Sequence, residues 1–300
     1  MQTLFVLLGP TGVGKTELGI SLANSLCCPI INADSRQIYK GIPIGTAAPT
    51  PEEQAAAKHF FVEQLSLQNY YSAAQYEADA MSCIQQLFRQ HDSLLLSGGS
   101  MLYIDAVCNG IDDIPTVSED VRLALNVRYE AEGLSPLLAE LKLLDSISYE
   151  SIDLNNPRRV IHALEVCVQT GRPYSSFLTK GARKRPFRIV KIGLQRPREE
   201  LFERIGLRVD AMMEQGLLEE AKSVLPLREC NALNTVGYKE LFAYFDGNCS
   251  LEEAVEKIKR NTRVYARKQM TWFSHDNSVV WFHPSHKADV LRFVKDCLSV

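Results

Sequence analysis

A glycine-rich octapeptide near the amino terminus restricts the possible folds of this chain more than any other feature. Gly9-Pro-Thr-Gly-Val-Gly-Lys-Thr16 matches the pattern G-x-x-x-x-G-K-[ST]. It follows the apolar run Leu4 to Leu8, which is typical of a buried parallel strand, and it precedes a helical pattern from Lys15 to Leu26. A strand, a glycine loop and a helix in this order predict an α/β domain with a phosphate-binding loop.

The glycine loop predicts a di- or triphosphate ligand, because its N–H groups and the following helix N-terminus favour an anion. Lys15 adds a positive charge, and the Thr16 hydroxyl can ligate Mg²⁺. Most such loops serve nucleotides, so a kinase or NTPase that binds ATP is one interpretation. That interpretation expects a carboxylate at the end of a later strand, and the segment Ser93 to Ser100 contains none.

The order of the other elements predicts a mostly parallel sheet flanked by helices, like that of P-loop NTPases, with an inserted helical subdomain. Further strand patterns occur at Pro29 to Ala33, Ser93 to Leu96, Phe187 to Leu194 and Val279 to Phe282. Strand signals vanish past about residue 112, and helical patterns follow near 118–131, 135–145 and 157–170. We therefore expect a core of residues 1–111 and 187–300 and a helical insertion of residues 112–186.

Two further strand ends carry polar residues. Ligand-handling residues of a parallel sheet lie beyond the carboxyl ends of its strands, so Asp34 should face the same crevice as the glycine loop. Asp34 could act as a general base or assist a metal, or it could cap a turn. Gly98-Gly99-Ser100 could form a second anion site, or simply a tight turn with Ser100 as a helix N-cap.

An arginine falls within an apolar helical stripe. Arg208 lies among residues that share one face of the helix opened by Pro197, namely Leu201, Ile205, Val209 and Met212. A cation on a core-facing side is costly without an anion, so a diphosphate or a buried carboxylate would be its partner. The alternative is an arginine whose stem packs while its guanidinium reaches solvent.

Basic residues gather in three places, although the net charge of the chain is -3. The first cluster is Arg158, Arg159 and His162. The second is Lys180, Arg183, Lys184, Arg185 and Arg188. The third is Arg260, Arg263 and Arg267, with Tyr265, Trp272 and Phe273 interleaved. Each cluster alone is more often a solvated surface, but the three together favour a polyanionic partner such as folded RNA.

Composition places the chain among ordinary soluble globular proteins. Its eight cysteines form no C-x-x-C pair, and no histidine cluster has metal-ligand spacing, which argues against a zinc site and favours a reducing cytosol. No apolar run approaches the length of a membrane span. We expect a cytoplasmic monomer with no membrane segment.

The motifs together resemble those of the tRNA dimethylallyltransferases, also called tRNA isopentenyltransferases, of the bacterial type. The resemblance covers nearly all of the chain and extends well beyond the glycine loop. The other matching segments are Asp34-Ser-Arg-Gln-Ile-Tyr39, Ile44-Gly-Thr46, Tyr71-Ser-Ala-Ala74, Gly98-Gly-Ser-Met-Leu-Tyr103, Pro157-Arg-Arg159, Ala163-Leu-Glu-Val166, Arg204 with Arg208, Val236-Gly-Tyr238 and Lys268-Gln-Met-Thr-Trp272.

The resemblance implies transfer of a prenyl group from dimethylallyl diphosphate to N6 of the adenosine 3′-adjacent to the anticodon in tRNA. The implied diphosphate site is Gly9, Pro10, Thr11, Gly12, Val13, Gly14, Lys15, Thr16 and Arg208, with Mg²⁺ on Thr16. The implied catalytic residues are Asp34, as the base toward N6, with Lys15, Thr16, Ser100 and Arg208. The implied tRNA contacts are the helical insertion and Asp34, Ser35, Arg36, Gln37, Ser100, Arg122, Arg158, Arg159, Val160, Ile161 and His162.

Two positions depart from the pattern of that family. Ser100 stands where threonine is usual and keeps the hydroxyl, whereas Ala48 stands where lysine is common and removes a charge. A kinase that uses ATP and a non-catalytic RNA-binding module are the alternative functions.

Overall fold

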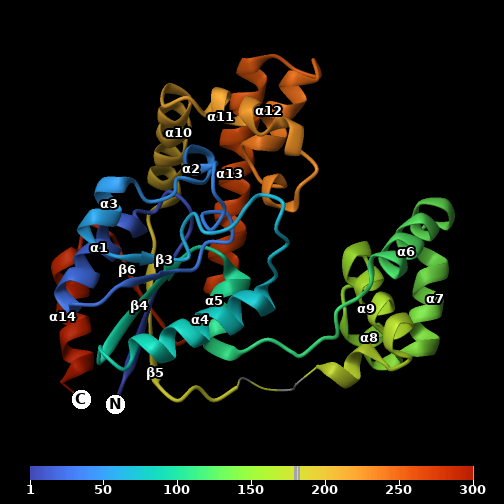
Figure 1. The fold of residues 1–300 in the computed structure, drawn as a ribbon, viewed down its shortest axis with the longest axis horizontal. Helices are drawn as coiled ribbons and strands as arrows, with labels where there is room; N and C mark the ends of the chain where they lie inside the picture. Colours follow the sequence, from blue (N-terminus) through green and yellow to red (C-terminus); the bar gives the residue numbers. More distant parts are fainter. Residues whose placement is uncertain (179–180, 182, 300) are drawn as a thin grey trace. The chain divides into compact units, whose positions relative to one another are not determined.

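The computed structural model describes residues 1–178, 181 and 183–299, and the chain divides into two compact units (Figure 1). The larger unit comprises Met1–Asn109 and Lys184–Val300, and the smaller unit comprises Gly110–Arg183. Each unit has a hydrophobic core of its own. No helix within the described ranges is both long enough and apolar enough to cross a membrane.

The larger unit is built on a parallel sheet with the strand order β3-β2-β4-β1-β5-β6 (Figure 1). Its strands, among the described residues, are β1 (Thr3–Leu8), β2 (Ile30–Asn32), β3 (His59–Phe60), β4 (Ser93–Gly98), β5 (Arg188–Leu194) and β6 (Val279–Phe282). Leu8 at the end of β1 is in register with Gly98 of β4, so the glycine loop leaves the sheet beside the end of β4. The expected fold class, a parallel sheet flanked by helices, is confirmed.

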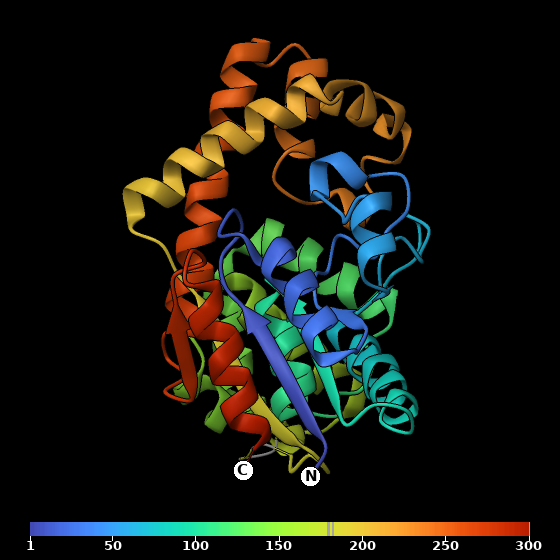
Figure 2. The same cartoon turned by 90° about the vertical axis from the view of Figure 1, so that its left-hand side faces the viewer.

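Helices cover both faces of this sheet. The helices α1 (Lys15–Leu26) and α14 (Lys287–Leu298) contact each other on the face turned to the viewer in Figure 2. The opposite face is covered by α4 (Ala73–Leu87) and α5 (Met101–Asn109), which also contact each other (Figure 1). The chain therefore alternates between the two faces, as parallel strands with helical crossovers require.

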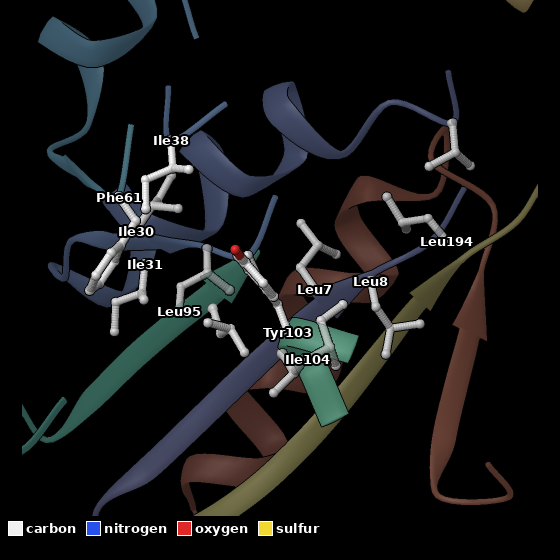
Figure 3. Close-up of a cluster of buried hydrophobic side chains, with 14 of the residues drawn as sticks. Leu7, Leu8, Ile30, Ile31, Ile38, Phe61, Leu95, Tyr103, Ile104 and Leu194 are labelled. Atoms are coloured by element: carbon white, nitrogen blue, oxygen red, sulfur yellow. The ribbon is translucent and has the colours of Figure 1, made fainter. Parts of the chain in front are cut away.

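The core of the larger unit lies between the sheet and these helices. All six residues of β1 are buried, which suits a strand with neighbours on both sides. Figure 3 shows Ile104 of α5 and Leu8 of β1, and these two residues line one pocket. The Tyr103 ring stacks on Tyr76 of α4, with 4.0 Å between ring centroids. Each fully buried aliphatic side chain stabilises the fold by about 1.5–3 kcal/mol.

A group of helices follows β5 and belongs to the same unit. Both α10 (Arg198–Glu214) and α12 (Tyr238–Phe245) contact α13 (Leu251–Phe273), which begins with a capping box between Ser250 and Glu253. α13 also contacts α5 near its carboxyl end, where Trp272 Nε1 donates to Asp105 at 2.8 Å. The other elements are α2 (Pro43–Thr46), α3 (Pro51–Ala56), α11 (Leu217–Ser223) and the 3-10 helices η2 (Leu225–Leu227) and η3 (Asn231–Leu233).

The smaller unit is helical in its described part. It contains α6 (Glu119–Glu132), α7 (Leu134–Leu144), α8 (Ser146–Ser151), α9 (Pro157–Thr170) and the 3-10 helix η1 (Tyr174–Phe177). As its sequence indicated, α9 starts at the N-cap Asn156, which accepts from Arg159 N, and stops at Gly171 with φ 66°. Its apolar face packs against Leu125 of α6 and Leu137 of α7.

Several short elements were not predicted, among them β3 and α8. β3 has only two residues, too few for any alternation of polar and apolar positions to show. α8 has six residues and is started by Asp145, whose carboxylate accepts from both the backbone N–H and the hydroxyl of Ser148. Local capping rather than periodicity forms this helix.

Candidate active site

The glycine loop is held from its outer side by two arginines. Arg204 Nε donates to the Gly12 carbonyl at 3.1 Å, and Arg196 Nε donates to the Val13 carbonyl at 2.9 Å. The C=O and the N–H of a trans peptide point in opposite directions, so the Gly14 N–H is directed away from Arg196. The arginines therefore hold the loop with this N–H turned to its inner side, as binding of a phosphate there requires.

Lys15, the first residue of α1, points back into the glycine loop. Its ammonium donates to the Gly9 and Pro10 carbonyls, both at 2.9 Å. The pKa of Lys15 is lowered to about 8, chiefly by burial; the charge of Asp34 opposes this change, and the charge of Arg208 adds to it. A desolvated ammonium in this position gains free energy from an additional anion, such as a phosphate.

The ends of β2 and β4 approach so closely that glycine is required. A Cβ on Gly98 would lie 2.2 Å from the Ala33 carbonyl oxygen. Ser100 N donates to that same oxygen at 3.1 Å, and the Ser100 hydroxyl accepts from Ser35 N at 2.8 Å. These two hydrogen bonds join the turns after β2 and β4. Asp34 lies between Ala33 and Ser35, the two residues of the β2 turn that make them.

Asp34 both caps a turn and acts electrostatically on the glycine loop. Its Oδ1 accepts from Arg36 N at 2.9 Å and from Gln37 N at 3.3 Å, so the capping role considered from the sequence is present. Its charge also opposes the lowering of the pKa of Lys15 and of Arg208. The Asp34 carboxylate thus lies within electrostatic reach of both cations, and one oxygen is enough for the cap.

Arg208 comes one helical turn after Arg204 on α10 and is half-buried. Burial lowers the pKa of its guanidinium, and the charge of Asp34 opposes this. Within the described ranges no ion pair to Arg208 forms. A desolvated guanidinium of this kind, near Lys15 and Asp34, fits an anion-binding role better than a side chain that reaches freely into solvent.

The residues near the glycine loop fit a magnesium ion that is bound together with a phosphate ligand. Thr16 is exposed at the start of α1, and its hydroxyl is a hard oxygen donor. Across the described part of the chain, no group of three or more His, Cys, Asp or Glu side chains is arranged to hold a metal. Mg²⁺ in phosphate sites takes one or two protein oxygens and completes its shell with phosphate oxygens and water, so it needs no such group.

Arg36 and Gln37, which the resemblance placed at the tRNA interface, are held by other parts of the protein. The Arg36 guanidinium donates to two carbonyls of η3 at 2.6 and 3.2 Å. The Gln37 amide donates to the Thr46 and Ala47 carbonyls at 3.1 and 2.7 Å. These bonds fix the segment that follows Asp34.

The smaller unit exposes basic side chains on α6 and α9. Arg158 and Arg159 are exposed in the first turn of α9. Arg122 Nε and His162 Nδ1 lie 3.8 and 3.4 Å from the carboxylate of Glu165, which is itself buried. These four side chains are available at the surface for an anionic partner.

Val160 and Ile161, which the resemblance placed with the tRNA contacts, lie on the inner face of α9. Their exposed fractions are 0% and 6%, and both belong to the core of the smaller unit. Their side chains therefore stabilise the position of α9 by packing. Their place among the tRNA contacts stays a prediction.

The second basic cluster is partly structural. Arg185 pairs with Glu77 at 2.7 Å, the two side chains are only 9% and 10% exposed, and Arg185 also donates to two carbonyls of α5. Arg188 donates to a carbonyl near the end of α14 at 2.7 Å. Lys180 lies outside the described residues. Arg185 and Arg188 therefore hold the fold together.

The third basic cluster lies on α13. Arg260 and Arg267 are exposed, whereas the Arg263 guanidinium lies over the Phe202 ring at 5.8 Å. Arg263 Nε is buried without a hydrogen-bond partner within the described ranges. Of these three arginines on α13, Arg260 and Arg267 are therefore more accessible to solvent than Arg263.

One functional candidate was not recognised from the sequence. Gln269 of α13 is 2% exposed, and its amide contacts both the glycine loop and the turn after β4. The available signal was the same as for Arg208, a polar residue in an apolar stripe, here Ala254, Ile258, Ala266 and Phe273.

Comparison with known proteins identifies the family. The sequence pattern of the IPP transferases matches residues 37–276. The chain belongs to this family. Because the matched region starts after the glycine loop and after Asp34, the assignment does not depend on the motif that first suggested a phosphate ligand.

Individual IPP transferases resemble the whole chain. The tRNA dimethylallyltransferase 1 of Phocaeicola vulgatus is 57% identical over 293 residues, which covers 98% of each chain. The tRNA dimethylallyltransferase 2 of Parabacteroides distasonis is 59% identical over 284 residues, or 95% of each chain. The resemblance drawn from the motifs is confirmed.

Two solved structures of related proteins share the fold. A tRNA isopentenylpyrophosphate transferase from Bacillus halodurans superposes with a TM-score of 0.73 at 34% identity, covering 100% of this chain and 97% of that one. A eukaryotic dimethylallyltransferase acting on tRNA gives a TM-score of 0.81 at 25% identity, covering 96% of this chain and 78% of that one. The IPP transferase fold thus spans both bacterial and eukaryotic examples.

Proposed function

We propose that this IPP transferase moves the dimethylallyl group of dimethylallyl diphosphate to N6 of the adenosine 3′-adjacent to the anticodon in tRNA. The products are N6-isopentenyladenosine and diphosphate. The observation that carries this proposal is the convergence of the glycine loop, Lys15, Arg208 and Asp34 at the ends of β1, β2 and β4. Its relatives include a tRNA dimethylallyltransferase and a tRNA isopentenylpyrophosphate transferase, which supports this proposal.

The diphosphate of the donor binds in the loop Gly9–Thr16. Lys15 and Arg208 supply positive charge where negative charge builds up as the carbon–oxygen bond to the diphosphate breaks. When bound, Mg²⁺ held through Thr16 adds further charge neutralisation on the leaving diphosphate. Arg196 and Arg204 keep the loop in shape from outside.

Asp34 acts as the base toward the acceptor amine. N6 forms a bond to the allylic carbon, the bond from that carbon to the diphosphate oxygen breaks, and the surplus proton on N6 passes to the Asp34 carboxylate. The adenosine must leave the anticodon-loop stack to reach this position. Ser100, bonded to Ser35 at 2.8 Å, fixes the turn that carries Asp34 and borders the acceptor base.

The tRNA contacts divide between the two units of the chain. The smaller unit, Gly110–Arg183, is the insertion that grips the anticodon stem-loop, with contacts from Arg122, Arg158, Arg159 and His162. The larger unit is the catalytic core, where Ser35, Arg36, Gln37 and Ser100 border the acceptor site. We place the enzyme in the cytoplasm as a monomer.

Incubation with labelled dimethylallyl diphosphate or with labelled ATP separates this proposal from a kinase. We expect label from the prenyl donor to appear in tRNA in the presence of Mg²⁺, and no transfer of phosphate from ATP to tRNA or a small acceptor. Tight ATP binding without prenyl transfer to tRNA would instead favour a kinase.

A further inference from the structure

Gln269 is a buried amide whose two ends are satisfied by two different loops of the site. It projects from the apolar face of α13 and is 2% exposed. Its Oε1 accepts from Thr11 N at 2.9 Å, and its Nε2 donates to the Gly99 carbonyl at 2.8 Å. A buried amide group needs hydrogen-bond partners, and both partners of this one are backbone groups.

The two partners of Gln269 belong to two adjoining loops of the candidate site, the glycine loop and the turn after β4. Thr11 belongs to the loop that is proposed to bind the diphosphate. Gly99 precedes Ser100, whose hydroxyl accepts a hydrogen bond from Ser35 N. The contact is close, because a Cβ on Gly99 would lie 2.6 Å from Gln269 Nε2 and 3.5 Å from Lys15 Nζ. Beyond the paired ends of β1 and β4, Gln269 therefore adds a side-chain link between the two loops.

We propose that Gln269 is a positioning residue that fixes the diphosphate loop relative to the turn bearing Ser100, and through it Asp34. This inference rests on the proposed prenyl transfer. Gln269 does not touch the reacting atoms, but it sets the separation between the group that holds the leaving diphosphate and the group that takes the proton. A fixed separation is what an in-line displacement between two bound substrates requires.

The chemistry of an amide suits this link. Glutamine presents a carbonyl acceptor and an N–H donor side by side on one planar group at every pH, whereas a carboxyl group does so only when it is protonated. Oε1 must face Thr11 N and Nε2 must face the Gly99 carbonyl, because the reverse orientation would pair two donors and two acceptors. The orientation of the amide is thus determined by its partners.

The first test compares Gln269→Met with two controls. Methionine keeps the length and fills the space but removes both hydrogen bonds. We expect kcat/KM for dimethylallyl diphosphate to fall by about 10²-fold, since a displacement of about 1 Å costs that much, while the Kd for tRNA changes by less than about 2-fold. Gln85→Met, at an exposed position of α4, should leave all values unchanged.

The second control separates positioning from stability. Asn261, also on α13, donates to Glu240 of α12 at 2.7 Å and has no contact with the glycine loop. Asn261→Ala should lower the melting temperature without a comparable loss in kcat/KM. An equal loss of kcat/KM in Asn261→Ala and Gln269→Met, at an equal decrease in melting temperature, would overturn the positioning role. Wild-type kcat/KM in Gln269→Met would also overturn it.

Gln269→Glu adds a second measurement, the pH dependence of kcat/KM, which a purely structural role of Gln269 would leave unchanged. A protonated glutamic acid can accept from Thr11 N and donate to the Gly99 carbonyl, whereas the carboxylate has no donor. The ratio of kcat/KM in Gln269→Glu to that of the wild type should therefore rise as the pH falls from about 8 toward the carboxyl pKa, which burial raises. A ratio that is flat with pH contradicts the inference.

Binding of inorganic pyrophosphate keeps this inference separate from the proposed reaction. Titration calorimetry of the full chain with pyrophosphate and Mg²⁺ should show a Kd about 10-fold weaker in Gln269→Met than in the wild type, since the loop is no longer held in its binding shape. This holds even if no prenyl transfer is found, a result that would contradict only the proposed function. Equal pyrophosphate affinities would contradict the positioning role.

Discussion

The backbone N–H of Ser35 donates to the Ser100 hydroxyl at 2.8 Å, and this bond joins the turns after β2 and β4. Ser100→Ala leaves that N–H without its partner at a site that is 7% exposed, which costs about 1–3 kcal/mol. The turn carries Asp34, so the lost bond should raise the activation free energy of the reaction. Each 1.4 kcal/mol of that increase lowers kcat/KM about 10-fold.

Ser100→Thr is the matched comparison, since it keeps the hydroxyl and matches the residue usual in the family. It should retain most of the activity, and the exposed substitution Ser82→Ala on α4 should retain all of it. Steady-state kinetics of prenyl transfer will distinguish these variants. Full activity in Ser100→Ala would show that the bond is dispensable.

Asp34→Asn separates the two roles of Asp34. The amide keeps an oxygen that can accept from Arg36 N and Gln37 N, so the turn should persist, but it cannot take a proton. We expect kcat to fall by about 10²- to 10⁴-fold, with tRNA binding largely kept. Asp296→Asn, at an exposed position of α14, is the control. Near-normal kcat in Asp34→Asn would remove Asp34 from the role of general base.

The affinity for the prenyl donor should depend on pH through Lys15. Its pKa in the free enzyme is lowered by burial to about 8, so the ammonium is intact well below that pH and loses its proton above it. The loss of positive charge weakens binding of a diphosphate, so KM for the donor should rise as the pH increases beyond 8.

Lys15→Arg is the control for this pH dependence, because arginine stays charged across the range. Its residual activity should show no comparable rise in KM. A wild-type KM that stays constant as the pH rises past the Lys15 pKa would mean that the charge of Lys15 does not contribute to donor binding. The measurement is a series of initial-rate titrations with dimethylallyl diphosphate at saturating tRNA.

Arg158 and Arg159 should contribute to tRNA affinity through phosphates. Both are exposed at the start of α9. Arg158→Ala and Arg159→Ala should each weaken tRNA binding and reduce the slope of log Kd against log salt concentration by about one per lost phosphate contact. Arg89→Ala, an exposed arginine of the larger unit, should leave the slope unchanged. Unaltered slopes in the α9 variants would remove them from the tRNA interface.

The parts of this fold that could be predicted from sequence are those fixed by local rules. The β1 run, the helix Lys15–Leu26 and the capped helix α9 appear where apolar runs, a glycine loop and N-cap residues place them. β3 and α8 were missed because they are too short to show a period. On the inner face of α9, Val160 and Ile161 follow the exposed arginines directly in sequence but pack into the core of the smaller unit.

The site was predictable where a motif carries its own chemistry and not where it depends on tertiary contacts. The glycine loop and Lys15 follow from an eight-residue pattern. The contacts of Gln269, which joins segments 258 and 170 positions away along the chain, depend on the tertiary packing of α13. No local sequence pattern predicts which groups Gln269 contacts. The contact between Arg36 and η3 could not be predicted for the same reason.

Mass spectrometry of tRNA after incubation with the protein, Mg²⁺ and dimethylallyl diphosphate tests prenyl transfer most directly. We predict that the adenosine 3′-adjacent to the anticodon gains one isopentenyl group with the wild-type chain, and that Asp34→Asn leaves it nearly unmodified. Unmodified tRNA with a folded wild-type chain, or a modification at a different nucleotide, would contradict the proposed function.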